Sequence, residues 1–92
     1  METTQEILSQ KLKEIFLTLI EEKSISNDFD CQSLSLSLFS VAHLNFTWEK
    51  SLSSLSRVGL RNCVIDSAPL FMSKEFYWSI MGLAKMVNHD IP

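Results

Sequence analysis

The densest apolar pattern in this chain lies between Ser73 and Asn88. At 100° per residue, one broad face of a helix collects seven residues of this segment: Leu83, Phe76, Val87, Ile80, Ala84, Tyr77 and Met81. Trp78 and Met86 fall outside that face, so apolar side chains reach nearly all the way round the helix. Because such a helix needs contacts on two sides and the chain is short, the pattern points to a protein partner or a second copy.

An amphipathic helix is also predicted near the N-terminus. Thr3 and Glu6 have the spacing of a capping box. Apolar residues then recur at helical spacing as far as Lys23: Leu8, Leu12, Ile15, Phe16 and Leu19. The stretch from 24 to 30 shows little periodicity and is predicted to be the first connection.

Residues 33–48 fit two kinds of structure. Serine and leucine alternate here with the period of a strand, yet Leu34, Leu38 and Val41 also fit a helix capped by Asp28 or Asp30. Two strands would need a turn near residues 42–43, where no turn-forming residue occurs. The sequence therefore favours a helix over residues 31–44. If the chain contains any strand, residues 33–48 are the place where it is expected.

A further helix is predicted from a cap at Thr47 to a stop at Gly59. Its apolar residues step at i, i+4, i+7 and i+10: Trp48, Leu52, Leu55 and Val58. Residues 60–65 form a short segment of helical turn or strand before the final helix. The predicted fold is all-α, a small bundle of four or five helices in a single domain spanning residues 1–92.

The amino-acid composition supports a helical fold and bears on where in the cell the protein is expected. Only two glycines and two prolines interrupt 92 residues, too few for many short strands. Fourteen serines are interleaved with Leu and Phe, and we interpret them as small polar positions on helix faces and caps. Hydrophobic residues make up 46% of the chain, but no run approaches the roughly 18 apolar residues of a membrane span. With no recognisable signal peptide, a cytoplasmic protein that does not enter a membrane is expected.

Charge is unevenly distributed. The net charge is −3, with −4 in residues 1–30 and +1 in residues 31–92. An acidic first third argues against a nucleic-acid surface there, although it could steer the protein toward a basic partner.

No pattern of residues indicates a metal, a cofactor or catalysis. Cys31, His43, Cys63 and His89 include no close pair of the kind that anchors zinc, and the cysteines are predicted to be free thiols. His43 is predicted to be a half-buried helix residue. With two histidines and no glycine-rich loop, the chain is predicted not to be an enzyme and to use no cofactor.

One motif suggests DNA. The segment 57–62 resembles the turn of a helix-turn-helix reader, with Gly59 ending one helix. Arg57, Arg61 and Asn62 would then contact DNA, the last two reading guanine and adenine. The surrounding segment has few basic residues, and Pro69 follows too soon for a long recognition helix, so this is the alternative hypothesis.

The leading hypothesis is a non-enzymatic protein–protein interaction module that self-associates as a homodimer. In the last helix, Phe76, Ile80, Leu83 and Val87 are assigned to the core. The predicted partner interface comprises Trp78, Met86, Tyr77, Met81 and, on the first helix, Leu17. Small, acidic, glycine-poor helical chains of this kind are typical of bacterial or phage regulators: inhibitors, adaptors, chaperones, immunity proteins and antitoxins.

Overall fold

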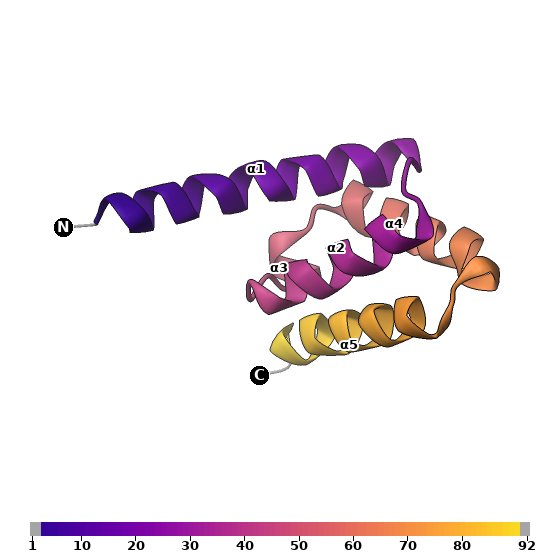
Figure 1. Ribbon diagram of the computed structural model, residues 1–92. Helices are drawn as coiled ribbons and strands as arrows, with labels where there is room; N and C mark the ends of the chain where they lie inside the picture. The colour runs from indigo at the N-terminus through magenta and orange to yellow at the C-terminus, as the bar shows by residue number, and fades with distance from the viewer. Residues whose placement is uncertain (1–2, 91–92) are drawn as a thin grey trace.

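The computed structural model describes residues 3–90 of the chain, with side chains as far as Asn88 (Figure 1). Over these residues the chain forms five α-helices and one turn of 3-10 helix, and no strand. The elements are α1 Thr4–Ser26, α2 Cys31–His43, α3 Trp48–Ser51, α4 Ser54–Ser67, η1 Ala68–Leu70 and α5 Ser73–Asp90. The predicted all-α fold is confirmed.

Both ends of α1 are closed by local hydrogen bonds. The Thr3 hydroxyl accepts from the backbone N–H of Glu6, and the Glu6 carboxylate accepts from the N–H of Thr3, each at 3.1 Å. The predicted capping box is therefore present. At the other end Asn27 adopts a left-handed conformation with φ of 55°, and the next N–H, that of Asp28, donates to the Lys23 carbonyl.

The ambiguous region, residues 33–48, is mostly helix. Asp30 caps α2 by accepting from the backbone N–H of Ser33 at 2.7 Å. Leu34 and Leu38, four residues apart, are fully buried on the inner face of this helix. The helical period therefore prevails over the alternation of serine and leucine.

The helix predicted from Thr47 to Gly59 does not exist as one element. Thr47 caps only the four-residue α3, after which Leu52 is extended and buried. Ser53 then caps a new helix, α4, by accepting from the N–H of Ser56. Gly59 lies inside α4 and does not end it, so the predicted stop is wrong.

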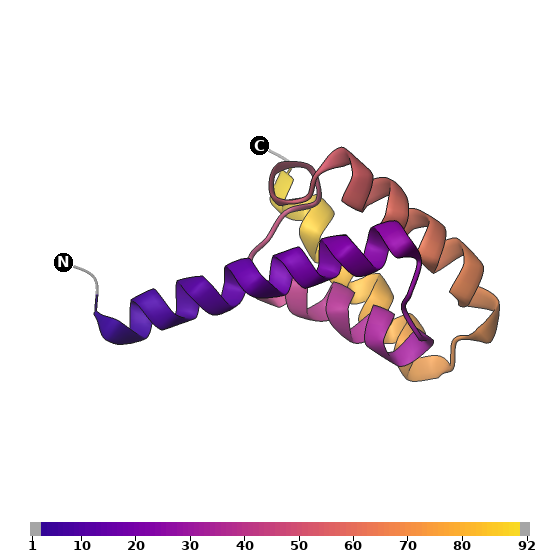
Figure 2. The ribbon, with the colours of Figure 1, turned by 90° about the horizontal axis from the view of Figure 1, so that it is seen from above.

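The helices pack as two pairs (Figures 1 and 2). In one pair α1 lies against α4, and in the other α2 lies against α5. A glycine marks each pair: Gly59 faces the Ser24 backbone of α1, and Gly82 faces the Leu38 backbone of α2. Between the pairs lies one cluster of buried hydrophobic residues, made of Ile20, Leu34, Leu38, Val41, Ala42, Leu52, Leu60, Cys63 and Met86.

Serine contributes to this interior as the composition suggested. Ser24, Ser35, Ser56 and Ser79 are all buried on helix faces. The Ser24 hydroxyl donates to the Ile20 carbonyl and that of Ser35 to the Gln32 carbonyl, so neither is left without a partner. At Ser24 and Ser35, a small side chain whose hydroxyl is satisfied within its own helix lets the helices approach closely.

The N-terminal part of α1 projects beyond the other helices (Figures 1 and 2). All residues from 3 to 12 are exposed. The molecule measures 48 × 29 × 25 Å, and its radius of gyration of 13.4 Å exceeds the roughly 12 Å expected for a compact chain of this length. The projecting segment of α1 accounts for the longest dimension.

Within residues 3–90, no helix is both long and apolar enough to cross a membrane.

Candidate protein-binding surface

The inner face of α5 includes two small residues. The residues that it buries are Glu75, Ser79, Gly82 and Met86. A Cβ atom on Gly82 would lie 2.6 Å from the carbonyl carbon and oxygen of Leu38, so α5 approaches α2 at its backbone. Because Ser79 and Gly82 occupy this contact, most of the large apolar residues of α5 lie on its other sides, with Met86 the buried exception.

This orientation reverses the predicted division of α5 into core and interface. Phe76, Ile80 and Val87, assigned to the core, are 43%, 61% and 48% exposed. Met86, assigned to the interface, is fully buried in the central cluster. Both assignments are wrong. The sequence pattern shows where apolar residues lie on the helix, but it does not show which face of α5 can pack closest to α2. Leu83, which was also assigned to the core, packs against the central cluster and is half-buried.

The exposed side of α5 carries a continuous apolar patch, which we call the α5 outer face. It comprises five residues at helical spacing, each 43–61% exposed: Phe76, Tyr77, Ile80, Met81 and Val87. Tyr77 and Met81, two of the predicted interface residues, are therefore accessible. At one end of the patch, the Phe76 ring makes an edge contact with Phe71, with a centroid separation of 5.3 Å.

The other two predicted interface residues are less accessible. Trp78 is half-buried, with the Lys74 ammonium 5.8 Å from its ring centroid. Leu17 on α1 is half-buried and packs against the central cluster, so it is less accessible than Tyr77 and Met81. The i, i+3 position of Leu17 relative to Ile20 turns it toward the same side as that buried residue.

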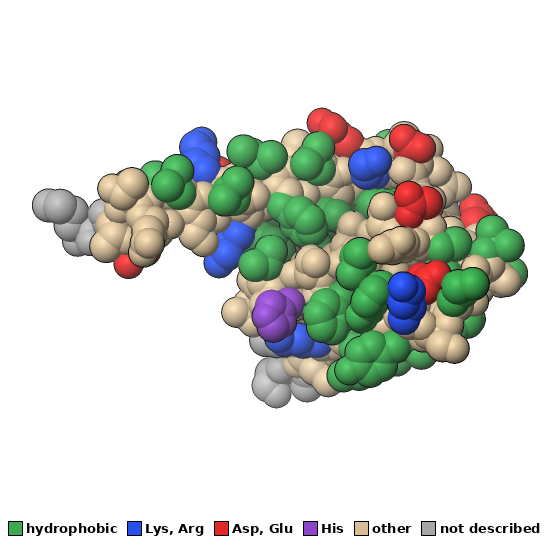
Figure 3. Space-filling model, in the orientation of Figure 1, with side chains coloured by type: hydrophobic (Ala, Val, Ile, Leu, Met, Phe, Trp, Pro, Cys, Tyr) green, Lys and Arg blue, Asp and Glu red, His purple; other side chains and the backbone are tan. Residues whose placement is uncertain are grey.

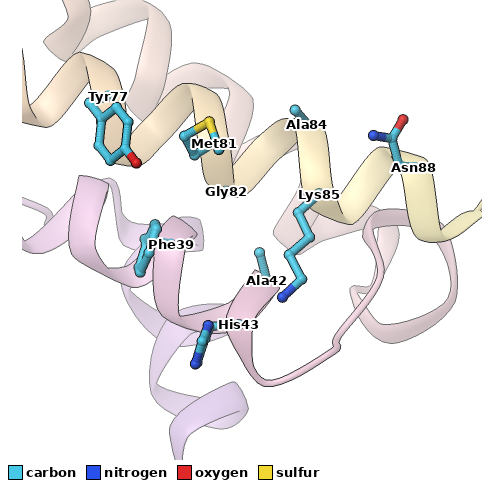
Figure 4. A pocket seen from close by; sticks show the side chains of 9 residues that line it. All are labelled: Phe39, Ala42, His43, Tyr77, Met81, Gly82, Ala84, Lys85 and Asn88. Carbon is cyan, nitrogen blue, oxygen red and sulfur yellow. The ribbon is translucent and has the colours of Figure 1, made fainter.

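A groove between α2 and α5 adjoins the α5 outer face (Figure 4). Its volume is about 550 Å³, and its walls come from three residues of α2 and six of α5: Phe39, Ala42, His43, Tyr77, Met81, Gly82, Ala84, Lys85 and Asn88. Tyr77 and Met81 belong to both the groove and the outer face. The two features therefore form one surface.

The groove has an aromatic end and a basic end. Figure 4 shows Tyr77 and Phe39 close to each other at one end, with the Lys85 side chain extending from α5 toward Ala42 and His43 at the other. The Phe39 and His43 rings stack with centroids 6.1 Å apart and planes 9° from parallel. His43 is exposed, which corrects the prediction that it is half-buried. The arrangement suits an apolar or aromatic group beside a negative charge.

The residues of the DNA hypothesis lie on one uninterrupted helix. Arg57, Arg61 and Asn62 all belong to α4, and no turn separates them at Gly59. The Arg57 guanidinium pairs with the Glu49 carboxylate at 3.4 Å and also donates to the Glu49 carbonyl. Arg61 and Asn62 are exposed. The helix-turn-helix geometry on which the alternative hypothesis depended is absent from this segment.

The two cysteines lie apart from the groove. Cys63 is completely buried, and its Sγ contacts the Ser24 carbonyl oxygen at 3.9 Å. Burial raises the pKa of the Cys63 thiol, and the nearby Asp66 carboxylate adds to the rise. Cys31 is half-buried beside the Ser67 carbonyl. Among the side chains described, no three His, Cys, Asp or Glu residues gather as metal ligands would; His89 lies outside that part.

Sequence reasoning missed Phe39 and Lys85 as parts of a surface. The available signal was the i, i+4 spacing of Phe39 and His43, which places both rings on one side of α2. Lys85 follows Met81 by the same interval on α5. Nothing in the linear pattern showed that these two sides would meet.

Comparison with known proteins adds no relative. No protein-family model, no curated protein and no solved structure matches this chain.

Proposed function

We propose that this chain is a non-enzymatic protein-binding module whose partner docks on the α5 outer face and the adjoining groove. The observation that carries the proposal is the orientation of α5, which buries Ser79 and Gly82 together with Met86 but leaves five other large apolar residues exposed. Five side chains exposing on the order of 100 Å² each make a patch of several hundred Å², the size associated with interaction sites. Tyr and Met, both present here, are enriched in such sites.

The groove indicates the chemistry of the partner. A short amphipathic helix suits it best, because it can place one apolar side chain between Phe39, Tyr77 and Met81 while its other contacts follow α5. An acidic residue one turn along that helix would lie near Lys85 and His43 at the basic end. The acidic N-terminal third, carrying −4, lies on a different part of the chain and is not needed for this contact.

Site-specific photocrosslinking in cells tests the proposal. A photoreactive phenylalanine analogue at Ile80 or Met81 is expected to give a discrete adduct with another protein. The matched control carries the same analogue at Asn62, which is also exposed on a helix but belongs to α4. Lys85→Glu should abolish the adduct at position 80, because it reverses the charge at the basic end of the groove.

Two outcomes would contradict the proposal. One is an equal pattern of adducts from positions 62 and 80, which would mean nonspecific contact. The other is an adduct at position 80 that Lys85→Glu leaves unchanged, which would remove the groove from the interface.

A further inference from the structure

A stripe of exposed leucine and isoleucine runs along α1. We call Leu8, Leu12, Ile15 and Leu19 the α1 stripe. These residues are 57%, 66%, 55% and 49% exposed, although each is large and apolar. Figure 3 shows hydrophobic side chains spaced along this helix, including the part that projects beyond the bundle. No other part of the described chain covers them.

The stripe lies on a different side of α1 from the residues that pack on α4. At 100° per residue its centre lies about 130° round the helix from the buried residues Ile20 and Ser24. A helix laid on the stripe would therefore not meet α4, which packs on the buried side. The stripe spans roughly three turns, and its N-terminal residues Leu8 and Leu12 also line a hollow with Leu44.

The spacing of the stripe is that of a coiled-coil seam, and it is symmetric. The intervals are four, three and four residues, which alternate as core positions of a heptad do. Read backwards, the intervals are the same. An antiparallel second copy therefore places Leu8 opposite Leu19 and Leu12 opposite Ile15, and the two-fold axis repeats both contacts.

The charges beside the stripe accept this register. Lys11 and Glu22 flank it on one edge. Like edges meet in an antiparallel pair, so with Leu8 opposite Leu19, Lys11 lies near Ile15 of the second copy and Glu22 near Thr4. No like charges face each other along the seam, so nothing electrostatic opposes the pairing.

A groove that shares Leu8 and Leu12 with the stripe supplies additional area. It is lined by Gln5, Leu8, Ser9, Leu12, Lys13, Phe16 and Leu44, under the projecting part of α1. Stripe and groove together expose apolar area on the order of 500 Å², and polar rim atoms supply the remainder of the roughly 800 Å² that each partner buries in a standard interface.

We infer that two copies of this chain pair through their α1 stripes in an antiparallel arrangement, centred between Leu12 and Ile15. Each projecting N-terminal segment then lies along the C-terminal half of the other copy's α1. The α5 outer face plays no part in this contact and stays free for the protein partner.

Analytical ultracentrifugation of the full chain tests the pairing. The unmodified protein should sediment as a dimer across the micromolar range. Leu12→Glu should weaken the dimer by roughly 100-fold or more, because both copies lose a buried leucine. Leu55→Glu, the matched control at an equally exposed leucine of α4, should leave the dimer intact. Circular dichroism of each variant establishes that it remains folded.

A mixing experiment tests the direction. Leu12→Glu and Ile15→Lys should each be monomeric alone and should form a heterodimer when mixed, because residue 12 faces residue 15 only in the antiparallel register. Rescue by mixing Leu12→Glu with Leu12→Lys, and not with Ile15→Lys, would overturn the antiparallel arrangement. A monomeric unmodified protein, or a dimer that Leu12→Glu leaves unchanged, would overturn the pairing itself. The adducts at position 80 of α5 are unaffected by either result, so the two proposals fail separately.

Discussion

Gly82 of α5 lies so close to Leu38 of α2 that a Cβ atom on the glycine would be 2.6 Å from both the carbonyl carbon and the carbonyl oxygen of Leu38. Backbone atoms cannot move aside as the end of a flexible side chain can. The contact therefore fixes how closely α2 and α5 approach and which side of α5 faces inward.

The first prediction concerns this contact. Replacing a mid-helix glycine by alanine ordinarily stabilises a helix, but Gly82→Ala should lower the free energy of unfolding by about 1–3 kcal/mol because the methyl group forces the helices apart. Urea unfolding followed by circular dichroism measures the change. Asn62→Ala, at an exposed position of α4, is the control and should have little effect. A Gly82→Ala variant more stable than the unmodified protein would contradict the close approach.

The second prediction distinguishes the two sides of α5. Met86→Ala should cost about 2–5 kcal/mol, because Met86 is fully buried and truncation leaves a cavity. Ile80→Ala, at a residue 61% exposed, should change stability by no more than about 0.5 kcal/mol. The same unfolding measurement compares them. Equal costs at the two positions would mean that α5 is oriented differently.

The third prediction concerns thiol reactivity. In the native protein at neutral pH, an aromatic disulfide reagent should modify Cys31 and leave Cys63 unmodified. Cys63 is completely buried, so the reagent cannot reach its sulfur. Burial also raises the pKa of the thiol, so little of the reactive thiolate is present at neutral pH. Denaturant should expose the second thiol. Cys31→Ser should remove the native reaction, and rapid modification of that variant would show that Cys63 is accessible.

The fourth prediction concerns the cap of α2. The backbone N–H and the hydroxyl of Ser33 bind the Asp30 carboxylate and lower its pKa. Because the folded pKa lies below the unfolded one, the carboxylate stabilises the fold above the unfolded value, and this contribution is lost as pH falls through the folded pKa. Asp30→Asn keeps a capping side chain that does not titrate.

The difference in unfolding free energy between the unmodified protein and Asp30→Asn should therefore be pH-dependent. It should favour the unmodified protein most above about pH 4 and diminish below that value. Chemical unfolding from neutral to acidic pH measures it. A difference that stays constant over this interval would mean that the ionised cap contributes nothing.

Local signals in the sequence were sufficient for most of the fold. The capping box at Thr3 and Glu6, the cap at Asp30 and the helical spacing of Leu34 and Leu38 depend on neighbours within one or two turns. Such features are set by backbone hydrogen bonds and side-chain period, so they can be recognised in a single chain.

The errors concern contacts between distant segments. Gly59 resembles a helix stop by type, but its role is set by Ser24, which lies 35 residues earlier on another helix. The inner face of α5 was misassigned for a similar reason: Gly82 allows an approach to Leu38 that side-chain hydrophobicity alone does not reveal. Tyr77 and Met81, predicted for the interface, are exposed, whereas the α2 side of the groove could be found only after the helices had been paired.

The order in which the helices pair has a consequence for folding. The first helix pairs with the fourth and the second with the fifth, so the two pairs interleave along the chain. A cut within residues 44–53, which include α3, leaves each fragment with one member of each pair, so neither pair can form within a single fragment. The two pieces can regain the native contacts only by binding each other. The chain thus has the topology of a split protein whose halves reassemble, and its folding depends on contacts between the halves more than on either one alone.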